Sequence, residues 1–429
     1  MQRESPYPMV SIDEAQRLIR EHITLLGVEE IDVLRDAAAG RVLAEDVYGV
    51  EPLPDAPKAA VDGYALRSDD GSAPRRVIAE VTAGAMPGLR VEPGTAVRIM
   101  TGAPIPDGAD AVIAVEYTDE RDSVLIVQRT LRAGDNIHTV GQDIAVGQLV
   151  LARGTTLGAA EIGLLATVGR ARVMVYRRPV VAVLATGDEV YEPDGEVFPG
   201  GVRDSNRYAL MAAVREAGGL ALSLGIARDD VNVQRAAILA ALDQADVLLT
   251  SGGVSMGTRD LIKPLLAELG TVHFGRIAFK PGKPTTFATI ERPASVRSAP
   301  LLAFGLPGYP VSSLVSFEVF VRPALRRLQG DAHPERPHVR VTLCEPIRPS
   351  ADRPEYQRAV VSWENGRLMA RSTGRQGSSR LLSMLGANAL LIVPAGMTPY
   401  AAGAELDALM TGHLAPPGAS SGSSSAQPQ

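Results

Sequence analysis

The chain has 429 residues, a length that predicts two to four domains rather than one compact core. Its formal net charge of −6 gives no sign of the basic surface that nucleic-acid-binding domains need, although an acidic protein can still carry a local basic pocket. The single cysteine, Cys344, excludes an intramolecular disulfide and a thiolate metal cluster. The N-terminus lacks the pattern of a secretory signal, and no apolar stretch reaches the roughly 18 residues of a transmembrane helix. We therefore expect a cytoplasmic protein that binds neither nucleic acid nor membrane.

The N-terminal part alternates helical and β patterns. A capping-box pattern at Ser11, followed by apolar residues at helical intervals, predicts a first helix. From about residue 46 to 145, short alternating runs separated by turns predict an inserted mostly-β domain. A second helix near 158–168 predicts that residues 8–45 and 146–177 form one discontinuous helical region around this insertion. Strands of the insertion are expected over 77–84, 95–102, 110–117 and 123–129.

Residues 178–329 have the pattern of a doubly wound α/β domain. Apolar runs typical of strands buried on both faces alternate with amphipathic helices, as in a parallel sheet covered by helices on both sides. Ligands of such sheets bind beyond the carboxyl ends of the strands. Residues 336–412 then read as short strands of a small β-barrel, and the Ser-rich residues 413–429 as a disordered tail.

Three short loops of the second half predict an anion site: SGGVSMGTRD (251–260), KPGKP (280–284) and GLPGYPVSS (305–313). Glycines permit close approach of the backbone, helix N-termini offer amides, and lysines supply positive charge. One Gly-rich loop is weak evidence, but three loops near one sheet edge indicate a phosphate-rich ligand. The residues expected to bind it are Gly252, Gly253, Ser255, Gly257, Lys280, Lys283, Pro307 and Ser312.

Carboxylates are expected beside these loops. Glu189 follows an apolar strand in the motif ATGDE, Asp229 lies in RDD, and Asp260 closes the first loop. Acidic groups repel an anionic ligand unless a divalent cation intervenes, so they predict Mg²⁺ held by Asp229, Asp260 and Glu189. Each of them alone is equally typical of a solvated loop residue or a helix cap.

The β region adds the motifs VDGYA, IMTGAPIP and GQDI, which contain Asp62, Thr101 and Asp143. By themselves these are typical turn residues. Together with ATGDE, SGGVS, KPGKP and GLPGYPVS, however, the motifs occur in the order seen in the MoeA family of molybdopterin molybdenumtransferases, which includes the E domain of gephyrin. The chain resembles this family from about residue 8 to residue 412.

The resemblance implies an elongated homodimer whose α/β domain is similar to the MoaB and Mog proteins. It implies a transferase that inserts molybdenum from molybdate into adenylylated molybdopterin, releases AMP and uses Mg²⁺. The active site would lie between the α/β domain of one subunit and the β domain of the other. Further partners would be the adenylyltransferase and cofactor-receiving proteins. The residues to which the resemblance assigns catalysis are Asp62, Thr101, Asp143, Glu189 and Lys280.

Three alternatives stay open. The α/β domain alone resembles molybdopterin adenylyltransferase, but the VDGYA and GQDI motifs favour the insertion step. A non-catalytic carrier of the cofactor precursor would have little need for the carboxylates Asp62 and Asp143. A tungstate-preferring paralogue is the third, because Tyr309 stands where the family usually has Asn, and Arg276 where some members have Lys.

Overall fold

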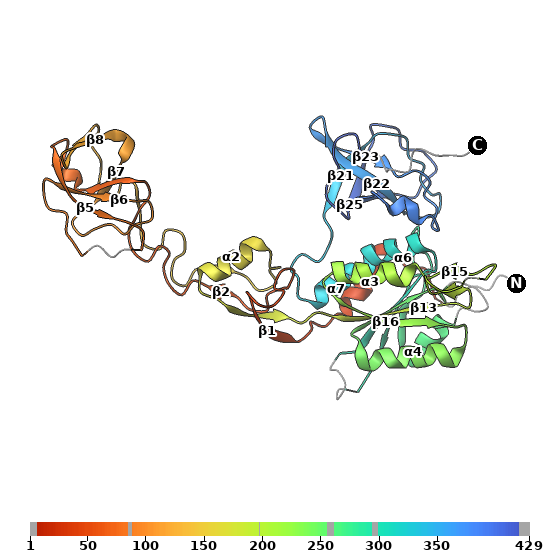
Figure 1. Ribbon diagram of the computed structural model, residues 1–429. Coiled ribbons are helices and arrows are strands. Elements are labelled where there is room, and N and C mark those ends of the chain that lie inside the picture. Colours follow the sequence, from red (N-terminus) through yellow and green to blue (C-terminus); the bar gives the residue numbers. More distant parts are fainter. Residues whose placement is uncertain (1–6, 85–87, 197, 255–260, 294–298, 420–429) are drawn as a thin grey trace.

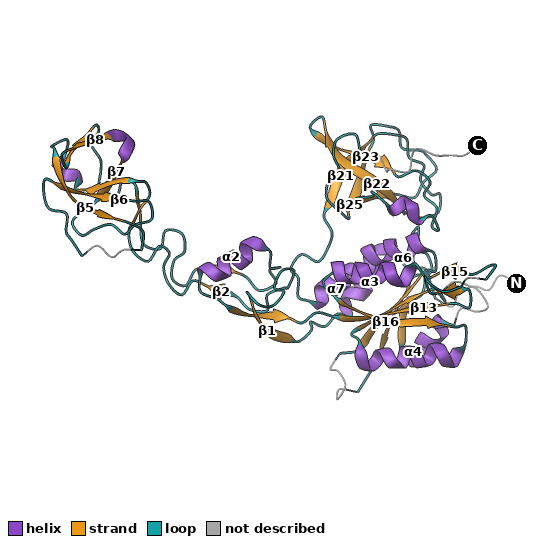
Figure 2. Ribbon diagram, in the orientation of Figure 1, coloured by secondary structure: helices purple, strands orange, loops and turns teal. Residues whose placement is uncertain are grey.

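The structure is a computed structural model that describes residues 7–84, 88–196, 198–254, 261–293 and 299–419. Figure 1 shows an elongated molecule in which a small lobe at one end is joined by a narrow middle region to the bulk of the protein. The small lobe consists mainly of strands, whereas the bulk has helices layered on a sheet and a separate barrel (Figure 2). Among the described residues, no helix combines the length and the apolar character needed to cross a bilayer.

The α/β domain is built on one six-stranded sheet with the strand order β16-β13-β17-β20-β19-β18. The first four strands are parallel, and β19 and β18 are antiparallel to their neighbours. In chain order, the strands are β13 (Val180–Thr186), β16 (Leu220–Ala227), β17 (Val247–Ser251), β18 (Thr271–Phe274), β19 (Thr286–Ile290) and β20 (Leu301–Leu306).

Helices cover both faces of this sheet. Alternate residues of β13 face different cores, since Val181 and Val183 lie in one cluster while Ala182 and Leu184 lie in another. The first cluster includes residues of α3, α6 and α7, and the second includes residues of α4 and α5. The helices are α3 (Asn206–Glu216), α4 (Val231–Gln244), α5 (Ile262–Leu269), α6 (Pro310–Ser316) and α7 (Arg322–Leu328), with the π-helical turn η3 (Phe317–Val321) between the last two.

The middle region is discontinuous in sequence. β1 (Val28–Asp32) pairs with β12 (Arg172–Tyr176), and β2 (Val47–Tyr48) pairs with β11 (Leu149–Leu151). Helix α2 (Ala159–Thr167) contributes Leu165 to the core of this region. Segments from before and after the insertion thus share one small core.

Helix α1 (Ile12–Glu21) lies elsewhere than expected. We expected it to pack beside the helix now identified as α2, but Ala15 and Ile19 are buried in the core of the α/β domain, next to η3. The apolar stripe predicts the helix but not its partner, because such a stripe fits any apolar face of suitable shape.

The small lobe holds a second six-stranded sheet with the order β7-β4-β6-β5-β9-β8. Gly63 is the first residue of β4. Only glycine fits at this position, because a Cβ there would lie 1.8 Å from the carbonyl oxygen of Ile113. This close approach fixes the backbone beside Asp62. The strands are β4 (Gly63–Leu66), β5 (Arg75–Val81), β6 (Thr95–Ile99), β7 (Ala111–Ala114), β8 (Thr118–Arg121) and β9 (Val124–Val127), with a short ladder of β3 (Lys58–Ala59) and β10 (Ile137–His138).

The C-terminal strands close into a five-stranded barrel with the order β21-β23-β22-β24-β25. Tyr356, Leu390 and Leu409 of the barrel belong to the core of the α/β domain, so the two modules are packed together. With the barrel, the predicted fold class is confirmed. The barrel strands are β21 (His338–Leu343), β22 (Glu355–Glu364), β23 (Arg367–Ser372), β24 (Ala389–Val393) and β25 (Glu405–Met410).

Candidate active site

Several loops meet at the edge of the α/β sheet where its parallel strands end. Thr186 at the end of β13 pairs with Ala227 of β16, and Ser251 of β17 pairs with Leu306 of β20. Because β19 runs antiparallel to β20, it begins where β20 ends. We call this edge the loop edge, and its described loops are 187–189, 228–230, 252–254, 280–284 and 307–309.

Glycines bring the loop 252–254 into direct contact with the end of β13. Gly252 and Gly253 have φ values of +92° and +65°, which favour glycine. A Cβ on Gly252 would lie 2.9 Å from the carbonyl oxygen of Thr186. Both glycines are half-buried, so the loop presents its backbone at the rim of the sheet, as the sequence predicted for an anion-binding loop.

Asn206, the first residue of α3, joins two of the loops. Its Nδ2 donates to Ser251 Oγ and to the carbonyl oxygen of Gly308, each at 2.7 Å. The predicted binding residues Pro307 and Ser312 are buried, and the carbonyl of Pro307 accepts a hydrogen bond from Ser313 Oγ at 2.9 Å. These bonds fix the spacing between the loops that follow β17 and β20.

The KPGKP loop is held by the barrel. Lys280 N donates to the carbonyl of Pro354 at 3.0 Å, and Tyr356 N donates to the carbonyl of Lys280 at 2.7 Å. Lys280 Nζ lies 3.1 Å from Glu355 Oε1; the lysine side chain is 40% exposed, the carboxylate only 4%. Lys283 is half-buried. The backbone on both sides of Glu355 therefore positions the first lysine.

Arg358 lies two residues further along the same face of β22 than Tyr356 and is fully buried. Its Nε and Nη2 donate to Ser383 Oγ at 3.1 and 3.0 Å, and Nη2 also donates to Gly377 O at 3.2 Å. Within the described part of the chain, its Nη1 has no hydrogen-bond partner. Burial lowers the pKa of Arg358 to about 10 while the charge of Glu355 raises it, so the guanidinium stays protonated at neutral pH.

The sequence reasoning missed Asn206, Glu355 and Arg358. The two charged residues in the run EYQRAVVSW, which is otherwise uncharged and reads as a strand, were a signal, because buried charges need partners or a ligand. For Asn206, the signal was a polar residue directly before a predicted helix at the edge where ligands bind. Neither signal stated which segment the side chain would reach.

The carboxylates Glu189 and Asp229 lie on adjoining loops. Glu189 is exposed, and its carboxylate folds over Gly187, where a Cβ would meet Oε2 at 2.6 Å. Asp229 is half-buried, and its Oδ1 accepts from Gln234 Nε2 at 3.4 Å. Both supply hard oxygen donors of the kind that Mg²⁺ prefers.

The predicted magnesium site is only partly described. In the described ranges, no group of three or more His, Cys, Asp or Glu side chains is arranged to hold a metal ion. Asp260, the third predicted ligand, lies outside the described residues, as do Ser255 and Gly257. The donor chemistry of Glu189 and Asp229 fits the ion, and the magnesium site itself stays a prediction.

Asp62 and Thr101 form a compact pair in the small lobe. Asp62 Oδ1 accepts from the Thr101 backbone N at 2.6 Å and from Thr101 Oγ1 at 2.7 Å. The side-chain and then the backbone hydrogen bond from Thr101 lower the pKa of Asp62, so this exposed carboxyl is ionised at neutral pH. The pair presents a fixed negative charge to solvent.

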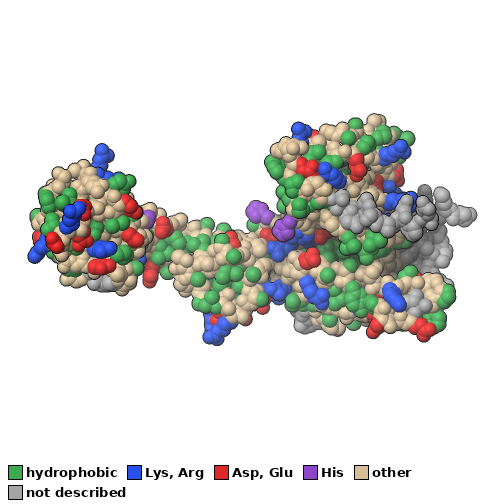
Figure 3. Space-filling view, turned by 45° about the horizontal axis from the view of Figure 1, so that its top comes forward, with side chains coloured by type: hydrophobic (Ala, Val, Ile, Leu, Met, Phe, Trp, Pro, Cys, Tyr) green, Lys and Arg blue, Asp and Glu red, His purple; other side chains and the backbone are tan. Residues whose placement is uncertain are grey.

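The structure does not bring the two groups of predicted residues together within one chain. Asp143 is exposed, and its backbone N donates to Leu53 O at 2.9 Å, on the side of the small lobe that faces the middle region. The small lobe lies at one end of the molecule and the α/β domain at the other (Figure 1). Acidic and basic side chains are interspersed over the face shown in Figure 3.

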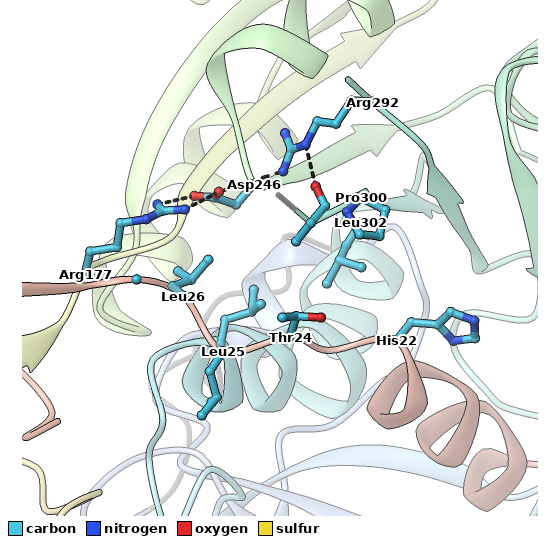
Figure 4. Close-up of a pocket in the computed structure, with 12 residues that line it drawn as sticks. His22, Thr24, Leu25, Leu26, Arg177, Asp246, Arg292, Pro300 and Leu302 are labelled. Atoms are coloured by element: carbon cyan, nitrogen blue, oxygen red, sulfur yellow. Dashed lines mark hydrogen bonds and ion pairs between the residues drawn. The ribbon is translucent and has the colours of Figure 1, made fainter. Parts of the chain in front are cut away.

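A pocket at the opposite edge of the sheet does not extend this site. Asp246, just before β17, is bound by Arg177 through two hydrogen bonds of 2.7 Å (Figure 4). Arg292 donates to the carbonyls of Ala299 and Ala245, each at 2.6 Å. These arginines anchor the amino end of β17 to the chain around it, so we assign the pocket a structural role.

Comparison with protein families covers most of the chain. Residues 10–169 match the MoeA N-terminal region (domain I and II). Residues 182–327 match a family described as a probable molybdopterin binding domain. Residues 340–410 match the MoeA C-terminal region (domain IV).

Individual relatives align over nearly the whole chain. A molybdopterin molybdenumtransferase of Bacillus subtilis is 34% identical over 96% of this chain and 95% of its own length. A gephyrin of Dictyostelium discoideum is 36% identical over 96% of this chain, which spans 64% of that longer protein. The crystal structure of a molybdopterin biosynthesis MoeA protein from Pyrococcus horikoshii has a TM-score of 0.77 and 31% identity, covering 95% of this chain and all of that one.

Proposed function

Since the chain belongs to the MoeA family, we propose that it is a molybdopterin molybdenumtransferase that inserts molybdenum from molybdate into adenylylated molybdopterin, with release of AMP and with Mg²⁺. The observation that carries the proposal is the convergence at the loop edge of a glycine loop and the KPGKP loop, with Lys280 Nζ 3.1 Å from Glu355 Oε1. An anion with several charged groups fits this arrangement.

The charges beside Lys280 favour an oxyanion. The KPGKP loop carries two ammonium groups, Lys280 and Lys283, and the buried carboxylate of Glu355 pairs with the first of them. Molybdate would bind beside Lys280, and the backbone of Gly252 and Gly253 with Lys283 would hold phosphate groups.

The carboxylates of the loop edge would hold Mg²⁺, with Asp229, Asp260 and Glu189 as ligands. The ion would neutralise negative charge at the phosphoanhydride. Molybdenum itself would be bound by the sulfur atoms of the substrate. Burial raises the pKa of the only thiol, Cys344, which disfavours the thiolate that a metal ligand needs.

A homodimer would complete the site. Asp62, Thr101 and Asp143 lie in the small lobe, far along the molecule from the loop edge of their own chain. If they act on the same substrate, the small lobe of one copy must reach the loop edge of another. We keep the cytoplasm as the predicted compartment, and the adenylyltransferase and cofactor-receiving proteins as predicted partners.

The test is to incubate the purified protein with adenylylated molybdopterin, Mg²⁺ and molybdate, and to measure AMP release and molybdenum incorporation. Lys280→Ala is expected to lower the rate by about 100- to 1,000-fold, because it removes a fixed charge from the oxyanion. Arg235→Ala is the control, since Arg235 pairs with Glu268 on the exposed side of α4. Unchanged turnover in Lys280→Ala would refute the assignment of this lysine.

The same assay separates the alternatives. No AMP release with molybdate, together with AMP release and tungsten incorporation when tungstate replaces it, would identify a tungstate-preferring enzyme. Consumption of ATP with free molybdopterin would identify an adenylyltransferase. Tight binding of the adenylylated substrate without AMP release under any condition would identify a carrier.

A further inference from the structure

Tyr309 lies at the rim of the loop edge. It precedes Pro310, the first residue of α6, and follows Gly308, whose carbonyl is bound by Asn206 at 2.7 Å. A Cβ on Gly308 would lie 3.7 Å from Gly252 Cα, so the two loops touch next to this tyrosine. The backbone of Tyr309 is extended, at φ −75° and ψ 131°, as expected before proline. The backbone that carries the ring is therefore held in one conformation.

Tyr309 is 61% exposed, and within the described ranges its ring makes no ring contact and its hydroxyl no hydrogen bond. Two other tyrosines at this edge do make such contacts. The Tyr191 ring lies beneath the Arg228 guanidinium at 5.2 Å, and the Tyr208 hydroxyl donates to Glu192 at 3.0 Å. These rings have partners inside the protein, whereas that of Tyr309 has none within the part of the chain that the structure describes.

We infer that Tyr309 is an aromatic platform that stacks on a heteroaromatic ring of the substrate. The inference rests on the proposed function, in which the substrate carries two flat rings, a pterin and an adenine, joined through phosphates. If the loops hold the phosphates, one ring must lie at the rim, within reach of this side chain. An aromatic side chain stacks on any base because every base has a π-face.

Tyr309 thereby increases the affinity of this chain for the heteroaromatic ring of the substrate. An asparagine, which the family resemblance leads one to expect at this position, can donate a hydrogen bond but cannot stack. Tyrosine adds apolar contact area with only two side-chain torsions to fix. Ring binding should therefore depend on the aromatic group and not on the hydroxyl.

The experiment compares ligands with and without a ring. Binding of AMP, pterin-6-carboxylate and ribose 5-phosphate to the full chain is measured by titration calorimetry for the wild type, Tyr309→Ala and Tyr309→Phe. Tyr309→Ala should weaken the binding of AMP, or of the pterin if that ring lies at the rim, by about 5- to 150-fold. Ribose 5-phosphate should bind all three proteins equally, and Tyr309→Phe should match the wild type.

Phe198→Ala is the matched control, because Phe198 is also 61% exposed but contacts Tyr191 with a ring separation of 6.2 Å. It should leave the three affinities unchanged. The inference is overturned if Tyr309→Ala weakens the binding of ribose 5-phosphate as much as that of AMP, or if it weakens the binding of neither AMP nor the pterin. It is also overturned if the wild type binds AMP and the pterin no more tightly than ribose 5-phosphate. Ring-dependent binding by a wild type that does not insert molybdenum would contradict only the proposed function.

Discussion

At the scale of single residues, the contact between Lys280 and Glu355 links two modules at the loop edge. The backbone of Lys280 is bonded on both sides by residues of the barrel, which fixes where its side chain starts. The carboxylate of Glu355 then fixes where the side chain ends, because a lysine that is 40% exposed has water as an alternative partner. Glu355 is thus a positioning residue that acts through Lys280.

We expect Glu355→Gln to lower kcat/KM for molybdate by about 10- to 100-fold, since the ammonium would no longer be held in one place. Steady-state AMP release at varied molybdate concentration measures this effect. Glu405→Gln is the control, because Glu405 pairs with Arg340 on the exposed surface of the same barrel. A Glu355→Gln enzyme with wild-type kinetics would show that the carboxylate does not position the lysine.

At the scale of elements, a pair of histidine rings in close, tilted contact joins α1 to the sheet. His22 ends α1 and His273 lies in β18, with ring centroids 3.7 Å apart. His273 Nε2 lies 2.9 Å from Thr289 Oγ1 of β19. Burial, and then the charge of His22, lowers the pKa of His273 to about 4. The pair therefore holds the first helix in place while the His273 ring is neutral.

The stability of this attachment should fall in acid. The folded pKa of His273 lies below the ordinary value near 6.5, so the unfolded chain binds the proton first as the pH falls. Stability contributed by the neutral ring is complete above about pH 6.5 and is lost progressively toward pH 4. Urea midpoints at pH 7.5 and pH 5 should differ less for His273→Leu than for the wild type.

His338→Leu is the control for this comparison, because His338 is exposed at the start of β21. Its midpoints should shift with pH as those of the wild type do. Equal acid sensitivity in His273→Leu and the wild type would mean that other groups account for the loss of stability.

Helices and strands were predictable where the pattern of apolar residues lies within the element itself. The second helix, expected near 158–168, is α2 at Ala159–Thr167, and the alternation of apolar runs with amphipathic helices predicted the parallel sheet and its loop edge. The partner of α1 was not predictable, because periodicity defines a face and not what covers it. The contact of Glu355 with Lys280 joins residues 75 positions apart. The sequence around either residue does not indicate that the other will be its partner.

At the scale of the whole molecule, the separation of the small lobe from the loop edge has a consequence for mixed dimers. Under the proposed function, one subunit supplies Lys280 and the other Asp62. A subunit damaged at one of these positions can then form a working site with a subunit damaged at the other. A site contained in one chain offers no such rescue.

We expect an equal mixture of Asp62→Ala and Lys280→Ala chains, unfolded and refolded together, to recover about a quarter of the wild-type rate, because half of the dimers are mixed and each keeps one intact site. AMP release by the two variants apart and together measures the recovery. The control pair is Asp62→Ala with Asp143→Ala, both in the small lobe, which should recover nothing. An inactive Asp62→Ala and Lys280→Ala mixture would place the whole site in one chain.

The chain leaves the middle region and returns to it at adjacent points. Gly49 N donates to Gln148 O at 2.9 Å, and Leu53 N donates to Ile144 O at 2.8 Å, so the segment between them starts and ends at one place. Such a segment is a cassette: a short turn could join its two ends and leave the rest of the chain intact. Evolution can therefore vary the small lobe and the loop edge separately, provided that each still fits the other across two copies.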